Sequence, residues 1–381
     1  MAQLKNIMVL GSGMVGAVMA EDLSKEKDFR VTVADRDPET LARLAKRADV
    51  KTVTADLSKP EKIHELIGPA DLVIGAVPGF LGFQTLKLVI EAGKCIADIA
   101  FMPEDAMELD GLAKNKNVTA VVDCGVAPGM SNLILGKYAA EFEEFEEALI
   151  LVAGLPRIRK WPFEYKAPFS PIDVIEEYTR PARYVLNGKI VTMPALSAPE
   201  LVDLPGVGTL EAFNTDGLRS LMKTIRCPNM KEKTMRYPGH IDLMLVLRET
   251  GFFSQTPVDV KGVQIKPLDL ATKLLFPMWK LQPGEEEFTV MRVQCTGTRS
   301  GKRVRHTYDL LDRFDAKTGF SSMARATGFP NVIMARLILN GTFKRRGVFP
   351  PELFGGQAEI FSAVTDGLLK RGVVFNHSEE I

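Results

Sequence analysis

Three glycines close to the N-terminus, Gly11, Gly13 and Gly16, limit the folds open to this chain. An apolar run over Ile7–Leu10 leads directly into them, and apolar residues at helical spacing follow, so the order predicts a strand, a tight turn and a helix. A second short strand should come next and end at Asp35. Together these features form the G-x-G-x-x-G fingerprint of a dinucleotide-binding βαβ unit, in the strand–turn–helix context that it requires.

Each residue of this glycine turn has an expected role in holding a dinucleotide. Gly11 makes the turn, Gly13 lets the backbone approach the pyrophosphate, and Gly16 lets the helix and the strand pack closely. Met14 and Val15 open the helix, where free N–H groups face the phosphates. We therefore predict that these five residues bind the cofactor.

Asp35 indicates which nicotinamide cofactor the turn accepts. Its carboxylate would accept hydrogen bonds from the adenosine ribose hydroxyls and repel the 2′-phosphate of NADP, so NAD is the expected cofactor. The neighbouring Arg36 keeps NADP as a less favoured alternative, because a guanidinium can pair with a phosphate.

Strand and helix patterns go on alternating as far as residue 124, which predicts an α/β fold with a doubly wound parallel sheet. The continuous apolar run over residues 71–77 is typical of a strand buried between two helical layers. Ligands bind at the carboxyl ends of such strands. The residues expected at those ends and assigned to the cofactor are Asp56, Ala76, Val77, Pro78 and Asp123.

The pattern changes beyond about Pro128. Asn187–Gly188 separates two alternating segments, which is a strong signal for a two-residue β-hairpin, and residues 287–311 predict a second hairpin. A helix should begin at Pro171, with Ser170 and Asp173 forming a capping box, and another is expected from about Thr215.

These signals predict a second α+β domain with a mainly antiparallel sheet. We expect residues 1–128 and 324–381 to form the dinucleotide-binding domain, with C-terminal helices that return to it. Residues 129–323 would form the domain for substrate binding, catalysis and dimerisation.

The bulk composition narrows the possible partners. Lys plus Arg and Asp plus Glu both number 48, so no basic surface for nucleic acid is expected. No apolar run reaches the length of a membrane span, and the four cysteines and four histidines are too scattered to suggest disulfides or a metal site. We expect a cytoplasmic homodimer that acts on a small molecule.

Three polar clusters in the second domain combine an arginine with groups able to transfer protons. They lie at residues 176–181, 216–220 and 236–240, and such a mixture suits an amino-acid substrate, because a guanidinium clamps a carboxylate and a carboxylate holds an amine. The alternative is that they are solvated helix ends and turns. The residues predicted to bind the substrate are Tyr178, Arg180, Asp216, Arg219 and Tyr237, with the two arginines as carboxylate clamps.

Several longer blocks show a family resemblance. Residues 73–83, 123–132, 154–156, 176–182, 216–221, 237–240, 320–323 and 327–329 resemble the saccharopine dehydrogenase-like family, and within it the closest likeness is to the NAD-dependent L-lysine 6-dehydrogenases. The resemblance spans nearly the whole chain. Where saccharopine-forming members tend to carry a G-L-D-P-G-I-D-H block, this chain has Ala127, Ser131 and Asn132 in place of the two Asp and the His, which favours the lysine branch.

The resemblance implies oxidative deamination of the lysine ε-amine by NAD, giving allysine, which cyclises to piperideine-6-carboxylate. An ε-ammonium group has a pKa of about 10.4, so its deprotonation at pH 7 costs roughly 4 to 5 kcal/mol, and the site needs a base or a desolvating pocket. We expect the base to be Asp98 or Glu177, with His240 as the next candidate. The alternatives are a saccharopine-type or polyamine-forming reductase and a non-catalytic dinucleotide-sensing protein.

Overall fold

The protein, described here by a computed structural model over residues 4–282 and 284–381, divides into two compact units. The first unit runs to Phe142 and adds Lys223–Ile225 and Met323–Val374. The second unit holds Glu143–Met222, Arg226–Ser322 and Phe375–Ile381. The chain thus passes repeatedly between the two units, and each is described by itself below.

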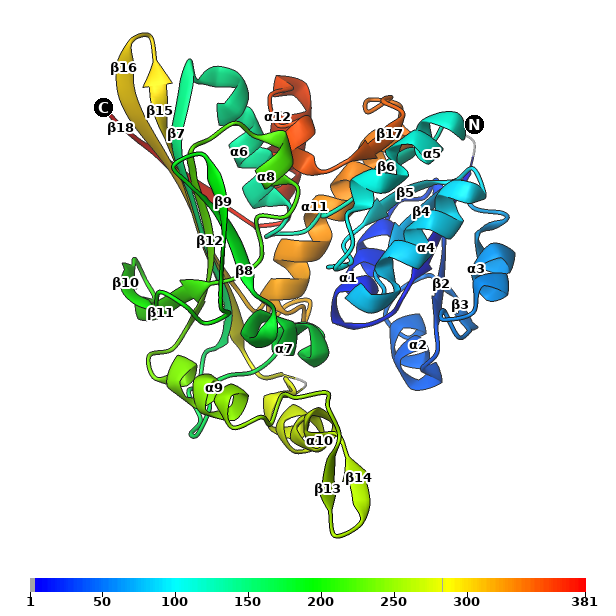
Figure 1. The fold of residues 1–381 in the computed structure, drawn as a ribbon. Helices are drawn as coiled ribbons and strands as arrows, with labels where there is room; N and C mark the ends of the chain where they lie inside the picture. Colours follow the sequence, from blue (N-terminus) through cyan, green and yellow to red (C-terminus); the bar gives the residue numbers. More distant parts are fainter. Residues whose placement is uncertain (1–3, 283) are drawn as a thin grey trace. The chain divides into compact units, whose positions relative to one another are not determined.

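The first unit is built on a seven-stranded sheet in the order β17-β6-β5-β4-β1-β2-β3, in which all neighbouring strands are parallel (Figure 1). The chain winds outward from β1 in both directions, which confirms the predicted doubly wound sheet. The strands are β1 (Lys5–Leu10), β2 (Phe29–Asp35), β3 (Lys51–Thr54), β4 (Leu72–Gly75), β5 (Cys95–Asp98), β6 (Thr119–Val121) and β17 (Gly347–Phe349).

Helices connect these strands, and α2 and α3 begin where the sequence provides a start signal. Asp37 accepts hydrogen bonds from the backbone N–H groups of Glu39 and Thr40, so α2 starts there, and Pro60 occupies the first turn of α3. The helices of this unit are α1 (Met14–Leu23), α2 (Pro38–Ala45), α3 (Pro60–Ile67), α4 (Gly79–Glu91), α5 (Asp110–Asn115), α6 (Met130–Glu141), α11 (Ser322–Leu339) and α12 (Ala358–Leu369).

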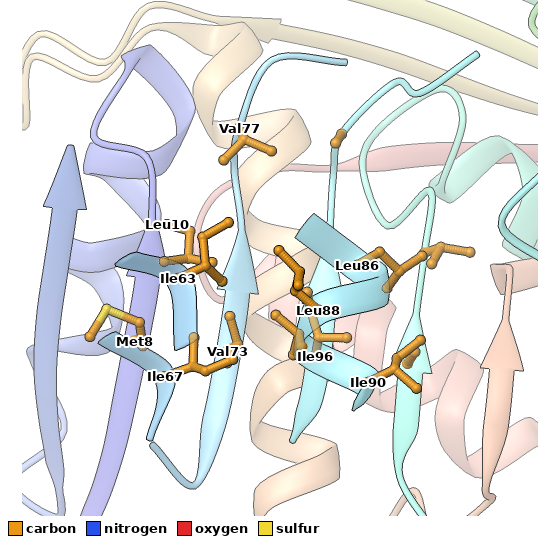
Figure 2. Close-up of a cluster of buried hydrophobic side chains, with 14 of the residues drawn as sticks. Met8, Leu10, Ile63, Ile67, Val73, Val77, Leu86, Leu88, Ile90 and Ile96 are labelled. Atoms are coloured by element: carbon orange, nitrogen blue, oxygen red, sulfur yellow. The ribbon is translucent and has the colours of Figure 1, made fainter. Parts of the chain in front are cut away.

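A hydrophobic core lies between the parallel sheet and helices α3 and α4. Figure 2 shows Met8, Val73 and Ile96 of the strands facing Ile67 of α3 and Leu88 of α4. All five side chains are buried, so this packing holds the strands in a fixed order beneath the ligand-binding edge.

The C-terminal helices belong to the first unit, where α11 packs on α1 and α12 packs on α11. A side chain at Gly328 of α11 would come within 2.9 Å of Met19, and one at Gly367 of α12 within 2.8 Å of Ile333 on α11. Asp22 of α1 pairs with arginines of both segments, so charge as well as close packing joins them.

The second unit is built on a nine-stranded sheet. Its main path runs β10-β11-β12-β7-β15-β16-β18, with β8 paired to β12 and β9 paired to β8. Neighbours are antiparallel except β12 and β7, which are parallel, so the sheet is mixed rather than fully antiparallel. The strands are β7 (Glu144–Pro156), β8 (Ala182–Leu186), β9 (Lys189–Met193), β10 (Glu200–Leu204), β11 (Gly208–Asn214), β12 (Asn229–Arg236), β15 (Glu287–Arg299), β16 (Lys302–Arg313) and β18 (Phe375–Glu380).

Helices α7 (Pro171–Thr179), α8 (Leu221–Thr224), α9 (His240–Glu249) and α10 (Pro267–Trp279) interrupt these strands, and a separate hairpin joins β13 (Val258–Val260) to β14 (Val263–Ile265) (Figure 1). The hairpin predicted around Asn187–Gly188 forms between β8 and β9. No helix in the part of the chain that the structure describes is long and apolar enough to cross a lipid bilayer.

Three local expectations differ from the structure. The helix expected from Thr215 is reduced to the single turn α8, because Arg219 has a left-handed φ of +48° that interrupts a helix. Ser170 lies at the N-cap of α7, but its side chain makes no capping hydrogen bond, so the predicted capping box is absent at this helix. Residues 375–380 form an edge strand of the second sheet instead of joining the first unit.

Candidate functional site

The glycine turn between β1 and α1 has the geometry that a bound dinucleotide requires. Gly11 has a φ of +109°, and a Cβ atom there would lie 2.4 Å from the carbonyl oxygen of Ala76. A Cβ atom at Gly16 would lie 2.2 Å from the carbonyl oxygen of Gly11. Gly13 differs, because it is exposed and a Cβ atom there would meet no atom within 4 Å. Two glycines therefore serve close packing, and the third leaves the approach to the helix N-terminus open for a phosphate group.

This turn lies at the topological switch point of the parallel sheet. β1 pairs with β2 on one side and with β4 on the other, and Leu10 is in register with Gly75. The segments that follow these two strands, Gly11 and Ala76, therefore flank the crevice in which ligands of such folds bind. The residues present fit a nicotinamide dinucleotide.

Asp35 ends β2 and faces the glycine turn. Its carboxylate accepts the backbone N–H of Ser12 at 2.6 Å and that of Asp37 at 2.9 Å. Each oxygen keeps a further lone pair for a ribose hydroxyl, so the carboxylate can both shape the turn and bind the sugar. Arg36 is exposed.

The other residues assigned to the cofactor lie in different environments. Met14 is exposed and Val15 is partly buried on the first turn of α1. Pro78 is the exposed N-cap of α4, whereas the side chain of Val77 packs in the hydrophobic core (Figure 2) and leaves only its backbone for a ligand. Asp123, which follows β6, is buried with a left-handed φ of +50°.

Asp56 follows β3 at the edge of the sheet and makes a local turn. The carboxylate of Asp56 accepts two hydrogen bonds from Ser58, one from the backbone N–H at 3.0 Å and one from the side-chain hydroxyl at 2.7 Å. These bonds lower the pKa of Asp56. Cofactor binding through this exposed side chain remains a prediction.

Asp98, the first candidate for the base, is fully buried at the end of β5. It accepts the backbone N–H of Ala100 at 2.7 Å, and its carboxylate lies directly over Gly75, where a Cβ atom would come within 1.8 Å of Oδ2. The buried thiol of Cys124 follows the next strand, and burial together with the charges of Asp98 and Asp123 raises its pKa. Cys124 is therefore a neutral thiol.

In the second unit, a buried arginine organises the predicted substrate residues. Arg236, at the end of β12, forms an ion pair with Glu177 and donates from Nε to the Tyr178 hydroxyl at 3.0 Å. Its guanidinium also lies over the ring of Tyr165, 4.4 Å from the centroid. Sequence analysis did not single out Arg236, although it stands next to Tyr237 in the predicted cluster.

His240 completes this group by hydrogen bonds at both ring nitrogens. Nδ1 lies 2.8 Å from the carbonyl oxygen of Phe163, which can only accept, so Nδ1 carries the proton. Nε2 then accepts from the Tyr178 hydroxyl at 3.0 Å. Burial and the charge of Arg236 lower the pKa of His240 to about 3, so it is neutral at physiological pH. The neutral ring of His240 orients Tyr178, and its role as a proton carrier stays a prediction.

Glu177 remains a candidate for the base. Burial raises its pKa, and the ion pair with Arg236 opposes that rise. Burial also raises the pKa of Tyr178, so this hydroxyl keeps its proton.

A carboxylate that the sequence analysis missed lies nearby. Glu232, Thr234 and Arg236 alternate along β12 and therefore share one face of the sheet. Burial, with the charge of Glu177 among the further causes, raises the pKa of Glu232 to about 7. Side chains alternate between the two faces of a sheet, so treating residues 229–236 as one strand would have predicted Glu232 and Arg236 on the same face.

Other predicted substrate residues have partners within the second unit. Asp216 receives two side-chain hydrogen bonds from Arg183, both of 2.8 Å, and Arg180 pairs with Glu176 one turn earlier on α7. Arg219 is partly buried, with the left-handed backbone noted above.

Tyr237, which is also predicted to bind substrate, donates its hydroxyl to the carbonyl oxygen of Pro156 at 2.9 Å. Its ring lies 4.6 Å from the guanidinium of Arg159. Asp216 and Tyr237 both have partners within the protein, and their binding to substrate stays a prediction.

The block in which the sequence has Ala127, Ser131 and Asn132 makes structural contacts in the first unit. Asn132 is fully buried on α6, accepts the backbone N–H of Gly129 at 3.2 Å and donates to Glu352 at 3.0 Å. Ser131 is buried beside it and donates to the same amide oxygen. These residues fix the loop that contains Ala127 and Gly129.

Among the described residues, no group of three or more His, Cys, Asp or Glu side chains is arranged to hold a metal ion. The arrangement instead offers a dinucleotide-binding edge in the first unit and a buried group of carboxylates, arginine and tyrosine in the second.

Two family models match the chain in succession. Residues 7–121 match the saccharopine dehydrogenase NADP binding domain, and residues 125–373 match the saccharopine dehydrogenase C-terminal domain. Together they cover both halves of the fold described above.

Known proteins show the same likeness at low identity. The chain is 24% identical to the mitochondrial alpha-aminoadipic semialdehyde synthase of Rattus norvegicus over 100% of this chain and 48% of that protein, so it spans about half the length of that relative. It is 23% identical to the carboxyaminopropylagmatine dehydrogenase of Synechocystis sp., over 92% of each chain. The solved structure of saccharopine dehydrogenase (L-Glu forming) from Saccharomyces cerevisiae superposes with a TM-score of 0.81 at 20% identity, over 99% of this chain and 100% of the other, which shows the shared fold.

Proposed function

Because the chain belongs to the saccharopine dehydrogenase family, we propose that it is a nicotinamide-dependent oxidoreductase that removes the ε-amine of L-lysine. In this reaction the ε-carbon gives a hydride to the cofactor, and water replaces the amine. Lysine, oxidised cofactor and water become allysine, ammonium, reduced cofactor and a proton. Allysine then cyclises to piperideine-6-carboxylate.

The glycine turn is the observation that carries this proposal. Gly11 and Gly16 are packed too closely for any side chain, whereas Gly13 leaves the start of α1 open. The relatives support the amine class of substrate, because their names refer to saccharopine, aminoadipic semialdehyde and carboxyaminopropylagmatine.

The chain's own residues would prepare the amine for oxidation. The bound cofactor supplies the hydride acceptor, but hydride leaves only a carbon that carries a neutral amine. Removing the ammonium proton costs roughly 4 to 5 kcal/mol at pH 7, so a buried carboxylate with a raised pKa is the appropriate base. Glu177 has such a pKa, and Asp98 is the alternative at the cofactor-binding edge.

We propose NAD as the cofactor, with NADP as the competing assignment. The carboxylate of Asp35, which contacts the glycine turn, would repel a 2′-phosphate, and this supports NAD. The matching family model is described as an NADP binding domain, and the exposed Arg36 is available to a phosphate.

The direct test is a spectrophotometric assay of the purified protein with L-lysine, without 2-oxoglutarate, using NAD and NADP in parallel. We expect reduced cofactor from lysine alone, faster with NAD. Ornithine and saccharopine serve as comparison substrates. Turnover with saccharopine but not with lysine would instead support the saccharopine-type alternative, and cofactor binding without any turnover would support a dinucleotide-sensing protein.

A further inference from the structure

Three carboxylates, including Glu232, form a group in the second unit, and only two of them pair with a cation. Asp216 pairs with Arg183, and Glu177 pairs with Arg236. Among the described residues, no cationic side chain forms an ion pair with Glu232. The three carboxylates Glu177, Asp216 and Glu232 therefore have one cationic partner fewer than their number.

Neighbouring basic residues do not supply this charge. Lys233 follows Glu232 on β12 and so lies on the opposite face, where its ammonium group pairs with Glu200 at 2.6 Å and donates to the carbonyl of Ala198 at 2.8 Å. His240 is neutral, because both of its nitrogens are engaged and burial keeps its pKa low.

Glu232 is built into its position with one oxygen left for a ligand. The residue is 6% exposed, and its Oε2 accepts the Thr215 hydroxyl and the backbone N–H of Gly217 at 3.2 Å. A Cβ atom at residue 217 would lie 2.4 Å from Cδ of Glu232, so only glycine allows this approach. No hydrogen bond from the described residues reaches Oε1.

A buried carboxylate without a cation is costly, so the charge must be neutralised by a proton or by a cationic ligand. We propose that Glu232, in place of the candidates Glu177 and Asp98, is the base: it binds the ammonium group of the amine substrate through Oε1 and accepts one of its protons. This inference rests on the proposed function. The step converts R–NH3⁺ and the Glu232 carboxylate into R–NH2 and the Glu232 carboxylic acid, so charge and atoms balance.

Three elements set the charge around Glu232. Glu177 faces it from α7, Asp216 faces it from the loop after β11, and Arg236 is two steps along its own face with Thr234 between them. Burial is the largest cause that brings its pKa to about 7. At pH 6 the free protein therefore holds a proton on Glu232 in most molecules, and a bound ammonium displaces it.

The test measures proton release when L-lysine binds to the purified protein at pH 6, by calorimetry in buffers of different ionisation enthalpy. The wild-type protein should release nearly one proton, and Glu232→Gln should release almost none. L-Norleucine, which lacks the ε-amine, should release none from either. Glu249→Gln, at the exposed end of α9, is the matched control and should behave like the wild type.

Turnover gives a second readout. Glu232→Gln should lower kcat/KM by about 10²- to 10⁴-fold and abolish the rise in rate with pH near 7. Thr215→Val removes a donor that favours the ionised carboxylate, so it should raise the pKa of Glu232 and move the midpoint of proton release to higher pH without removing it. Glutamine keeps an oxygen for the Gly217 N–H, and thermal unfolding checks that the variant folds.

The results separate this inference from the proposed function. Unchanged proton release and an unchanged pH profile in Glu232→Gln, or equal affinity of the wild type for lysine and norleucine, would overturn the assignment of Glu232. The wild type could fail to reduce either cofactor with any amine, which would reject the proposed oxidoreductase function. If it still bound n-butylammonium with proton release that depends on Glu232, the assignment of Glu232 as an ammonium-binding base would stand.

Discussion

At the scale of single residues, the pairing of each acidic side chain decides what it can do. Asp216 accepts hydrogen bonds from Nε and Nη2 of the Arg183 guanidinium, which joins the loop after β11 to strand β8. Glu232 has only a hydroxyl and an amide as donors. Both carboxylate oxygens of Asp216 bind Arg183, whereas one carboxylate oxygen of Glu232 can still accept a hydrogen bond from a ligand.

Asp216→Asn should therefore reduce stability and leave substrate affinity unchanged. The substitution removes the charge that Arg183 binds, and we expect the free energy of unfolding to fall by about 1–3 kcal/mol. Urea unfolding measures the loss, and KM for the amine should stay within about twofold of the wild type. A large rise in KM with unchanged stability would return Asp216 to the substrate-binding group.

His240 should make the stability of the second unit depend on pH. Its folded pKa of about 3 lies below the ordinary value of 6.5, so the unfolded chain takes up a proton first as the pH falls. The stabilisation is complete above pH 6.5 and is lost progressively below it. Between pH 7 and pH 5 this loss amounts to about 2 kcal/mol at ~1.4 kcal/mol per unit.

Urea unfolding at these two pH values tests the prediction. His240→Gln should lose less stability than the wild type on acidification, whereas His64→Gln, on the exposed face of α3, should follow the wild type. Equal acid sensitivity in all three proteins would show that His240 is not the group responsible.

At the scale of elements, the turn between β1 and α1 depends on close backbone contact. A methyl group at Gly16 would overlap the carbonyl of Gly11, so Gly16→Ala should separate helix from strand. We expect a loss of about 1–3 kcal/mol of stability and at least tenfold weaker cofactor binding. Gly111→Ala on α5, where a Cβ atom meets nothing within 4 Å, is the control and should be neutral or slightly stabilising.

Elements with a local signal were the ones that could be predicted from sequence. Pro60 marks the start of α3, and Asn187–Gly188 specifies the β8–β9 hairpin, because each acts through its own backbone preferences. The helix predicted from Thr215 does not form, because Arg219 has a left-handed φ. The spacing of apolar residues carries no information about this backbone conformation. The side-chain network of Arg236 joins residues far apart in the chain, so no local pattern contains it.

At the scale of the whole molecule, the two units share the chain in an interleaved way. Residues 323–374 complete the first unit, and the next residues pair as β18 with β16 of the second unit. No single cut therefore separates the units. The chain crosses between the units after Phe142, at 322 and 323, and again after Val374, and periodicity gives no sign of this last return.

Truncation after Val374 should weaken the second unit selectively. Loss of β18 leaves the edge of β16 unpaired, and an exposed edge strand promotes association between molecules. Calorimetry should show a lower unfolding temperature for the second unit, and light scattering should show larger particles. An unchanged melting profile without association would mean that β18 contributes little to the second sheet.

The position of β18 also has a consequence for the order of events during synthesis. The ribosome delivers residues 323–374 of the first unit before it delivers the strand that completes the second sheet. Most of the second unit must therefore wait with an open edge while the first unit receives its closing helices. The first unit can complete its folding once residue 374 has been synthesised, and the second unit only once residues 375–380 have followed.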